Sequence, residues 1–252
     1  MRNVFQIATI MLLTSAALSG GRAEAAPVYE LRIYTTHPGK MPDLLARFRD
    51  HTCTLFKRHG MENVGYWLPL EQKDGDKLYY ILKHPSRDAA QAAWKAFGAD
   101  PEWQTVRKAS EANGAIVAGV ESVFLAPTDY SPTIPVLSGP HVFELRTYTT
   151  NDGKLETLDT RFREHTMALF AKHGVTNLSY WHATDTDKGA GKTLFYMLAY
   201  PSREVATKAW AEFQADPEWI KVRTESELAG RILIKDCIKS VYLAPTDFSP
   251  LK

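Results

Sequence analysis

The stretch VYELRIY (28–34) returns as VFELRTY (142–148), and this pair sets the architecture of the chain. Apolar and polar side chains alternate along each stretch, which predicts a β-strand with one apolar face. In the first copy the apolar face carries Tyr29, Leu31 and Ile33, and the polar face carries Glu30, Arg32 and Tyr34. We expect the apolar face to pack against helices of its own repeat.

The rest of the chain repeats with these strands, since residues 28–132 correspond to residues 142–250. The offset between the copies is 114 at Glu30, 116 at Pro85 and 118 at Val123, so the copies differ by two short insertions. Such insertions are typical of surface turns. A period of this length indicates a duplicated domain, because the repeats of solenoids span roughly 20 to 50 residues.

The order of elements within one copy predicts an α+β fold. A strand at 28–34 is followed by a helix over 41–59, a hairpin of strands at 61–68 and 77–83, a helix that Ser86 caps, a short helix that Asp100 and Pro101 open, and a strand at 120–125. This β-α-β-β-α-β order is that of a ferredoxin-like domain, whose helices cover one face of the sheet. We therefore expect the two uncovered faces to pack face to face as a barrel-like pseudo-dimer within one chain.

Residues 1–25 have the pattern of a signal peptide. Arg2 precedes an apolar run over 4–18, and Ala23-Glu24-Ala25 matches the small-x-small cleavage site. The run is shorter than the ~20 residues of a membrane-spanning helix. We predict cleavage after Ala25 and a periplasmic or secreted protein with no membrane attachment. It would contain domain 1 (26–132), a Pro-rich linker (133–140) and domain 2 (141–252).

The composition argues against nucleic acid and anionic membranes as partners, and it indicates no cofactor. Without residues 1–25 the chain has 28 basic and 28 acidic residues, so its net charge gives no attraction to nucleic acid or an anionic membrane. Cys53 and Cys237 have no cysteine at the matching repeat position and are predicted to be free, buried thiols. No metal site is predicted, because His51 and His59 lie about 12 Å apart along one helix.

The polar strand residues are the first candidates for a site. If the helices cover the apolar face of each first strand, the polar residues of both copies point between the two sheets. Buried charges must then either pair as structural elements or line a ligand cavity. His51 and His165, on the first helix of each repeat, are candidates for a base or haem ligand near the barrel mouth, or for structural residues. Tyr66 and Tyr180 line a pocket or belong to the core. The candidate ligand-lining residues are Glu30, Arg32, Tyr34, His51, Tyr66, Glu144, Arg146, Tyr148, His165 and Tyr180.

Five motifs, in a fixed order in both copies, resemble the NIPSNAP family. They are Glu-Leu-Arg-x-Tyr on the first strand, His-Thr in the first helix, Tyr-Trp on the second strand, Ala-Asp-Pro-Glu-Trp after the second long helix, and a terminal Pro-Thr-Asp-Phe-Ser-Pro, with Tyr for Phe in the first copy. The resemblance implies the dimeric α/β-barrel fold. It implies no reaction, and the mitochondrial and vesicle roles of animal members do not suit an exported protein.

Three functions remain open at this point. The first is binding of a small molecule between the two sheets. The second, by analogy of fold alone, is a cofactor-poor enzyme of the monooxygenase-like or haem-handling type. The third is a ligand-free interaction module, and assembly with further copies of the chain is also left open. A cavity kept in one repeat and filled in the other would favour the first two functions. The sequence assigns no catalytic residues and no cofactor.

Overall fold

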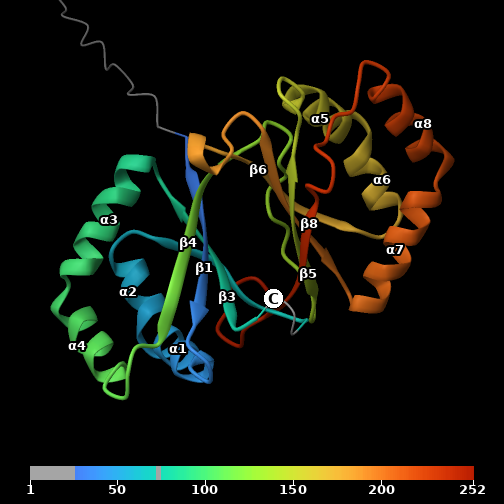
Figure 1. The fold of residues 1–252 in the computed structure, drawn as a ribbon. Helices are drawn as coiled ribbons and strands as arrows, with labels where there is room; N and C mark the ends of the chain where they lie inside the picture. The colour runs from blue at the N-terminus through green and yellow to red at the C-terminus, as the bar shows by residue number, and fades with distance from the viewer. Residues whose placement is uncertain (1–25, 72–74) are drawn as a thin grey trace, which may run out of the picture.

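The computed structural model describes residues 26–71 and 75–252, so the predicted signal peptide lies outside the described residues. Eight antiparallel strands close one barrel in the order β1-β3-β2-β8-β5-β7-β6-β4. The helices form two layers on opposite flanks of the barrel, one from each repeat (Figure 1). The predicted α+β fold, with two ferredoxin-like repeats in one barrel, is confirmed.

Each repeat has the predicted order of elements. The first comprises β1 (Val28–Thr36), α1 (Met41–Arg47), the π-helical turn η1 (Phe48–Thr52), α2 (Cys53–Arg58), β2 (Glu62–Pro69), β3 (Lys77–His84), α3 (Arg87–Ala99), α4 (Pro101–Ser110) and β4 (Val117–Pro127). The second comprises β5 (Val142–Thr149), α5 (Leu155–Arg161), the π-helical turn η3 (Phe162–Thr166), α6 (Met167–Lys172), β6 (Thr176–Ala183), the 3₁₀ turn η4 (Thr186–Lys188), β7 (Thr193–Tyr200), α7 (Arg203–Ala215), α8 (Pro217–Ser226) and β8 (Lys239–Pro245).

The first helix of each repeat contains a π-helical turn that the sequence pattern did not predict. In the first repeat, Thr52 Oγ1 donates a hydrogen bond to the carbonyl of Arg47 over 3.1 Å, and Thr166 does the same with Arg161. The hydroxyl thereby pairs with a carbonyl five residues earlier, within the widened turn. Single π-turns inside α-helices are frequent at functional sites.

Polar caps begin the later helices as the sequence predicted. Ser86 Oγ accepts a hydrogen bond from the Ala89 amide, and Asp100 Oδ1 accepts one from the Glu102 amide. His59 Nε2, at the end of α2, donates to Asp100 Oδ2 over 2.8 Å. His59 is therefore a structural residue that joins α2 to the start of α4, and His173 joins α6 to α8 through Asp216 in the same way.

The barrel interior is filled with apolar side chains. Trp67 and Trp181, one from each repeat, are almost fully buried there. The buried residues of this cluster are Leu31, Trp67, Tyr79, Ile81, Leu125, Phe143, Leu145, Leu178, Trp181, Ala183, Phe195, Met197, Ala199 and Leu243. Ile134 and Leu137 of the linker pack against the same cluster. The predicted ligand site between the two sheets is therefore wrong in its placement, because this space is occupied by the core that joins the repeats.

Strand pairing between the repeats closes the barrel. β2 pairs with β8, where Trp67 lies opposite Pro245, and β4 pairs with β6, where Leu125 lies opposite Ala183. Within the described residues these pairings close the sheet, which reduces the rows of unpaired amides that invite aggregation.

The terminal Pro-Thr-Asp-aromatic-Ser-Pro motif of each repeat docks on the other repeat. The Tyr66 amide donates to Ser249 Oγ, and the Tyr66 carbonyl accepts from the Thr246 amide. Arg49 forms a two-pronged ion pair with Asp247 at 2.6 and 2.8 Å. The reciprocal contacts join Tyr180 to Ser131 and Thr128, and Arg163 to Asp129. The two copies of the motif thus hold the repeats together reciprocally, and we call them the clasps.

We expect fragments 26–132 and 141–252 to aggregate or to form homodimers when they are expressed separately. Each would expose the apolar barrel face and two open strand edges, a larger apolar patch than a monomer tolerates. Size-exclusion chromatography and thermal unfolding of each fragment check this expectation. A soluble monomeric fragment with a sharp thermal transition would contradict it.

Candidate functional site

A buried carboxylate in each repeat joins the outer face of the sheet to the helix above it. In the first repeat this residue is Glu30, which is 1% exposed. Its oxygens accept hydrogen bonds over 2.6 to 3.2 Å from Arg32 Nη1, Ser122 Oγ, Trp94 Nε1 and His84 Nε2. In the second repeat Glu144 accepts hydrogen bonds from Arg146, Ser240, Trp210 and Tyr200. These bonds compensate for burying the charge and fix α3 and α7 on their sheets.

The same contacts show that the polar face of β1 and β5 points toward the helices, opposite to the prediction from the sequence. Trp94 lies on α3 outside the barrel, so Glu30, Arg32 and Tyr34 face the helices, as do Glu144, Arg146 and Tyr148. The prediction that these six residues point between the sheets is wrong. The barrel interior, enclosed by strands and filled by apolar side chains, supplies few partners for a charge, whereas the helical side supplies indole, hydroxyl and imidazole donors. Glu30 and Arg32 form the pair expected for a structural role.

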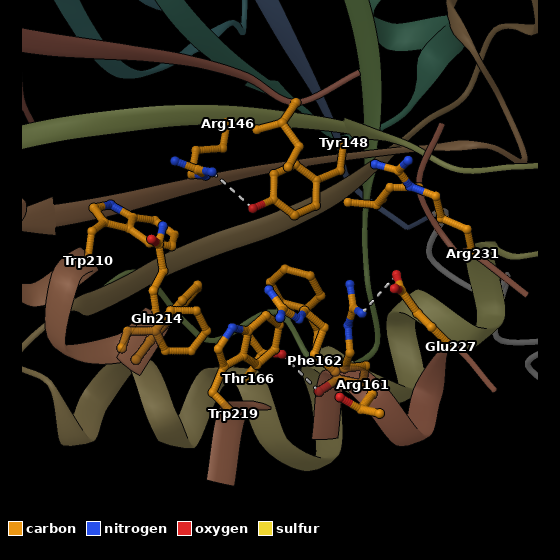
Figure 2. Close-up of a pocket in the computed structure, with 16 residues that line it drawn as sticks. Arg146, Tyr148, Arg161, Phe162, Thr166, Trp210, Gln214, Trp219, Glu227 and Arg231 are labelled. Carbon is orange, nitrogen blue, oxygen red and sulfur yellow. Dashed lines mark hydrogen bonds and ion pairs between the residues drawn. The ribbon is translucent and has the colours of Figure 1, made fainter. Parts of the chain in front are cut away.

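A cavity of about 940 Å³ lies between the second repeat's sheet and its helices (Figure 2). Strand β5 forms one wall, the helices α5 to α8 form others, and the segment between α8 and β8 closes the rim. The lining residues are Arg146, Tyr148, Arg161, Phe162, Thr166, Phe170, Trp210, Phe213, Gln214, Trp219, Arg223, Thr224, Glu227, Arg231, Leu233 and Ile238. The volume is within the range of ligand sites, roughly 300 to 1,000 Å³.

The cavity lining is strongly basic, with four arginines and one carboxylate. Arg146 is held by its own strand, since it donates to Glu144, to Tyr148 Oη over 3.0 Å and to Tyr196 Oη over 2.8 Å. Among the described residues, Arg223 and Arg231 form no side-chain ion pair. The cavity therefore carries positive charge that the protein itself does not neutralise.

Arg161 is the most deeply buried of these arginines, at 4% exposure. Its Nη1 lies 3.7 Å from Glu227 Oε1 and 3.4 Å from Ser226 Oγ, and its Nε has no hydrogen-bond partner among the described residues. Burial lowers the pKa of Arg161, and the charge of Glu227 offsets this only in part. The π-turn begins directly after Arg161 and brings Phe162 and Thr166 to the same cavity wall.

The equivalent positions of the first repeat are paired more tightly. Arg47 Nη1 lies 3.0 Å from Glu111 Oε1, and Arg107 Nε lies 3.3 Å from Glu111 Oε2. Glu111 thus forms an ion pair with both arginines. In the second repeat Glu227 lies farther from Arg161, and no ion pair joins it to Arg223 in the described part of the chain.

One of the two insertions lies at the rim of the cavity. In the first repeat the ladder between β1 and β4 extends to the pair Thr36 and Val117, with one register shift between Thr35 and Thr36. In the second repeat the ladder between β5 and β8 stops at Thr147 and Lys239, and a single bridge joins Thr150 to Leu233. Residues 234–238 leave the sheet between these points, with Asp236 in the left-handed region at φ 58°. The insertion therefore replaces a regular strand by a loop at the cavity rim.

The other sequence candidates lie elsewhere. Tyr66 and Tyr180 are fully buried in the cores beneath the helices, and each donates its hydroxyl to an asparagine. His51 lies on the outer surface beside α4, and His165 is 43% exposed with Glu164 3.8 Å away. Of the ten candidates, the structure brings only Arg146 and Tyr148 to the cavity.

The described residues contain no metal site. Within 26–71 and 75–252, no three His, Cys, Asp or Glu side chains gather to hold a metal ion. Cys53 and Cys237 are both free and half-buried. No helix in this part of the chain combines the length and the apolar character that crossing a membrane requires.

A family model described as NIPSNAP matches residues 29–132 and 143–250. The chain belongs to the NIPSNAP family. This confirms the resemblance seen in the sequence motifs, and both repeats of the NIPSNAP chain are covered. A comparison with curated proteins finds no match.

Solved structures share the fold of this NIPSNAP protein at low sequence identity. A candidate monooxygenase from Lactobacillus acidophilus is 12% identical over 87% of this chain and 94% of that chain, with a TM-score of 0.56. A candidate monooxygenase from Fusobacterium nucleatum is 10% identical over 88% and 93%, with a TM-score of 0.57. An uncharacterized NIPSNAP domain protein from Burkholderia xenovorans is 22% identical over 42% of this chain and 98% of its own, with a TM-score of 0.36. The first two likenesses show the barrel fold.

Sequence reasoning missed most of the residues that form the cavity. Arg161 and Arg223 have arginine counterparts in the first repeat, so the repeat comparison did not single them out. A signal was available at Gln214, Arg231 and Ile238. Gln214 and Arg231 differ from their counterparts Gly98 and Ala115 within matching segments, and Ile238, the counterpart of Val120, follows the insertion. These differences between the repeats gather around one cavity.

The buried carboxylate of Glu30 makes stability depend on pH. Although burial raises its pKa, the hydrogen bonds from His84, Ser122 and Trp94 and the charge of Arg32 lower it from 4.5 to about 2. Because the folded pKa is the lower one, this stabilisation is present above about pH 4.5 and is lost as the pH falls through about 2. It amounts to about 3 kcal/mol in the free energy of unfolding.

We expect Glu30→Gln to lack this part of the pH dependence. Urea unfolding at stepped pH values should show the free energy of unfolding of the wild type falling more steeply than that of Glu30→Gln between about pH 5 and 2. Glu62→Gln is the control, because Glu62 is 64% exposed and forms only a surface pair with Lys83. Parallel curves for the wild type and Glu30→Gln would contradict the expectation.

Proposed function

We propose that this NIPSNAP-family protein binds a small organic molecule in the cavity of its second repeat, between the sheet and the helices. The observation that carries the proposal is the excess of arginines over carboxylates in that cavity, where the nearest carboxylate oxygen to the buried Arg161 is 3.7 Å away. A guanidinium that is buried without a close anionic partner is costly to the protein. A bound ligand that offsets this cost gives the arrangement a function.

The difference between the repeats supports the same proposal. In the first repeat Glu111 pairs with both Arg47 and Arg107, whereas in the second Glu227 lies 3.7 Å from Arg161 and forms no ion pair with Arg223 among the described residues. The second repeat also has the rim loop 234–238. After a duplication, one copy can keep the structural role while the other acquires a site. Such divergence at cavity-lining positions is not expected of a ligand-free interaction module.

An enzyme of the monooxygenase type is the second candidate. It is favoured by the names of two fold neighbours and by the Tyr148 hydroxyl, which faces the cavity beside Arg146. The lining residues include a single carboxylate, Glu227, and no histidine, so few groups can take up a proton at neutral pH. Binding is therefore the function that the geometry supports best. A ligand that returns from incubation with the protein in air with one added oxygen would instead establish the enzyme.

We also propose that the chain is exported and that its mature form begins at Ala26. The support is the charged start, apolar run and Ala-x-Ala site of residues 1–25. N-terminal sequencing of protein recovered from the periplasm or medium of a bacterial host checks this, and we expect Ala26 as the first residue. Recovery of chains that still begin at Met1 would count against export.

We expect native mass spectrometry of the mature protein, purified without denaturation, to show an adduct of small-molecule mass. Thr224→Trp places a large side chain at the cavity, from an exposed position on α8, and should abolish the adduct. Lys108→Trp is the matched control at the equivalent position of the first repeat and should retain it.

Two results would overturn this proposed function. One is an adduct that persists unchanged in Thr224→Trp. The other is a bare polypeptide mass combined with no stabilisation of the wild type by any fraction of a host extract in thermal unfolding, since a ligand that binds the folded state must raise the melting temperature.

A further inference from the structure

We infer that the ligand class of this cavity is an aromatic carboxylate, with its anionic group at Arg161 and Arg231 and its ring against the tryptophans. The inference rests on the proposed function and specifies it. Arg161 and Arg231 extend into the cavity from the side on which Glu227 lies (Figure 2). Each nitrogen of Arg146, by contrast, already donates a hydrogen bond within the protein, to Glu144, Tyr148 or Tyr196.

The anionic group follows from the state of Arg161. Its side chain is 4% exposed, its Nε has no partner among the described residues, and the nearest carboxylate oxygen is 3.7 Å from Nη1. Arg47, its counterpart, also has an unpartnered Nε but holds Glu111 at 3.0 Å. A carboxylate matches the planar donor fork of a guanidinium and would supply the pairing that Glu227 leaves incomplete.

Arg231 adds a second positive charge that the first repeat does not have. Its counterpart there is Ala115, and the glycine and isoleucine on either side match in both repeats. Arg231 is exposed at the rim and makes no ion pair within the described residues. It is therefore free to meet an anion that enters the cavity, and Arg161 would hold that anion deeper inside.

The aromatic body follows from the other walls. Arg161 lies over the ring of Trp219 at 5.3 Å, and Trp219 packs on Phe213 with ring centroids 4.5 Å apart. Phe213 in turn contacts Trp210 at 5.6 Å. These rigid flat surfaces suit a planar apolar ring, which gains from offset or edge-to-face contacts. A cavity of about 940 Å³ is also far larger than a bare inorganic anion needs.

Apolar side chains stand exposed near the cavity entrance. Ile238, which lines the cavity, is 49% exposed, and Ile234 in the same loop is 42% exposed. Leu228, next to Glu227, is 81% exposed. An entrance with this apolar character favours an organic anion over a hydrophilic one.

Isothermal titration of the mature chain with 2-naphthoate, 2-naphthalenemethanol and inorganic phosphate tests the inference. We expect naphthoate to bind with a Kd at least tenfold below that of the neutral alcohol, and phosphate not to compete. Arg161→Gln should weaken naphthoate binding by roughly 10- to 100-fold, because a charged hydrogen bond is lost. Arg47→Gln, the matched control in the first repeat, should leave the Kd within about twofold.

Arg231→Ala keeps the test decisive if Arg161→Gln fails to fold. It installs the residue that the first repeat has naturally, at an exposed position, and should weaken naphthoate binding severalfold without lowering the melting temperature.

Three outcomes would overturn the inference. Equal affinity for acid and alcohol would show a cavity that does not select an anion. Phosphate binding with no gain for naphthoate would show an adventitious ion only. The third is no binding of either naphthalene probe. In each case the co-purified adduct and its loss in Thr224→Trp still decide the proposed function separately.

Discussion

Closure of the barrel is the constraint on which the rest of the structure depends. A four-stranded sheet with helices on one face leaves the other face and both edges unsatisfied. The two repeats solve both problems at once, because β2 pairs with β8, β4 pairs with β6, and the apolar faces meet inside. The reciprocal clasps through Ser131 and Ser249 secure the same joints from outside.

A filled barrel determines where chemistry can occur. Trp67 and Trp181 occupy the space that joins the repeats, so a ligand cannot lie there without removing the core. The polar residues of β1 and β5 are consequently placed on the helical side, where Glu30 and Glu144 each receive four donors. That side also contains the cavity. Strand alternation thus separates the two tasks, with the inner face devoted to stability and the outer face available for recognition.

Duplication lets one half of the molecule vary while the other keeps the framework intact. The buried clusters are nearly the same in both repeats, with His84 in one replaced by Tyr200 in the other. Glu111 pairs with both first-repeat counterparts of Arg161 and Arg223, whereas Glu227 pairs only with Arg161 among these, at 3.7 Å. The rim loop 234–238 adds to the difference.

The sequence by itself determined the duplication, the order of elements, the caps at Ser86 and Asp100, and the family, because these depend on local patterns that are written twice. The alternation in β1 also divided its side chains correctly into two faces. Only the tertiary structure decided which face points into the barrel. Both faces are covered, and the alternation of side chains does not tell which of them faces the helices. It also decided that each terminal motif crosses to the other repeat. The cavity depends on distances between residues such as Arg161 and Glu227, far apart in the chain, which no local pattern fixes.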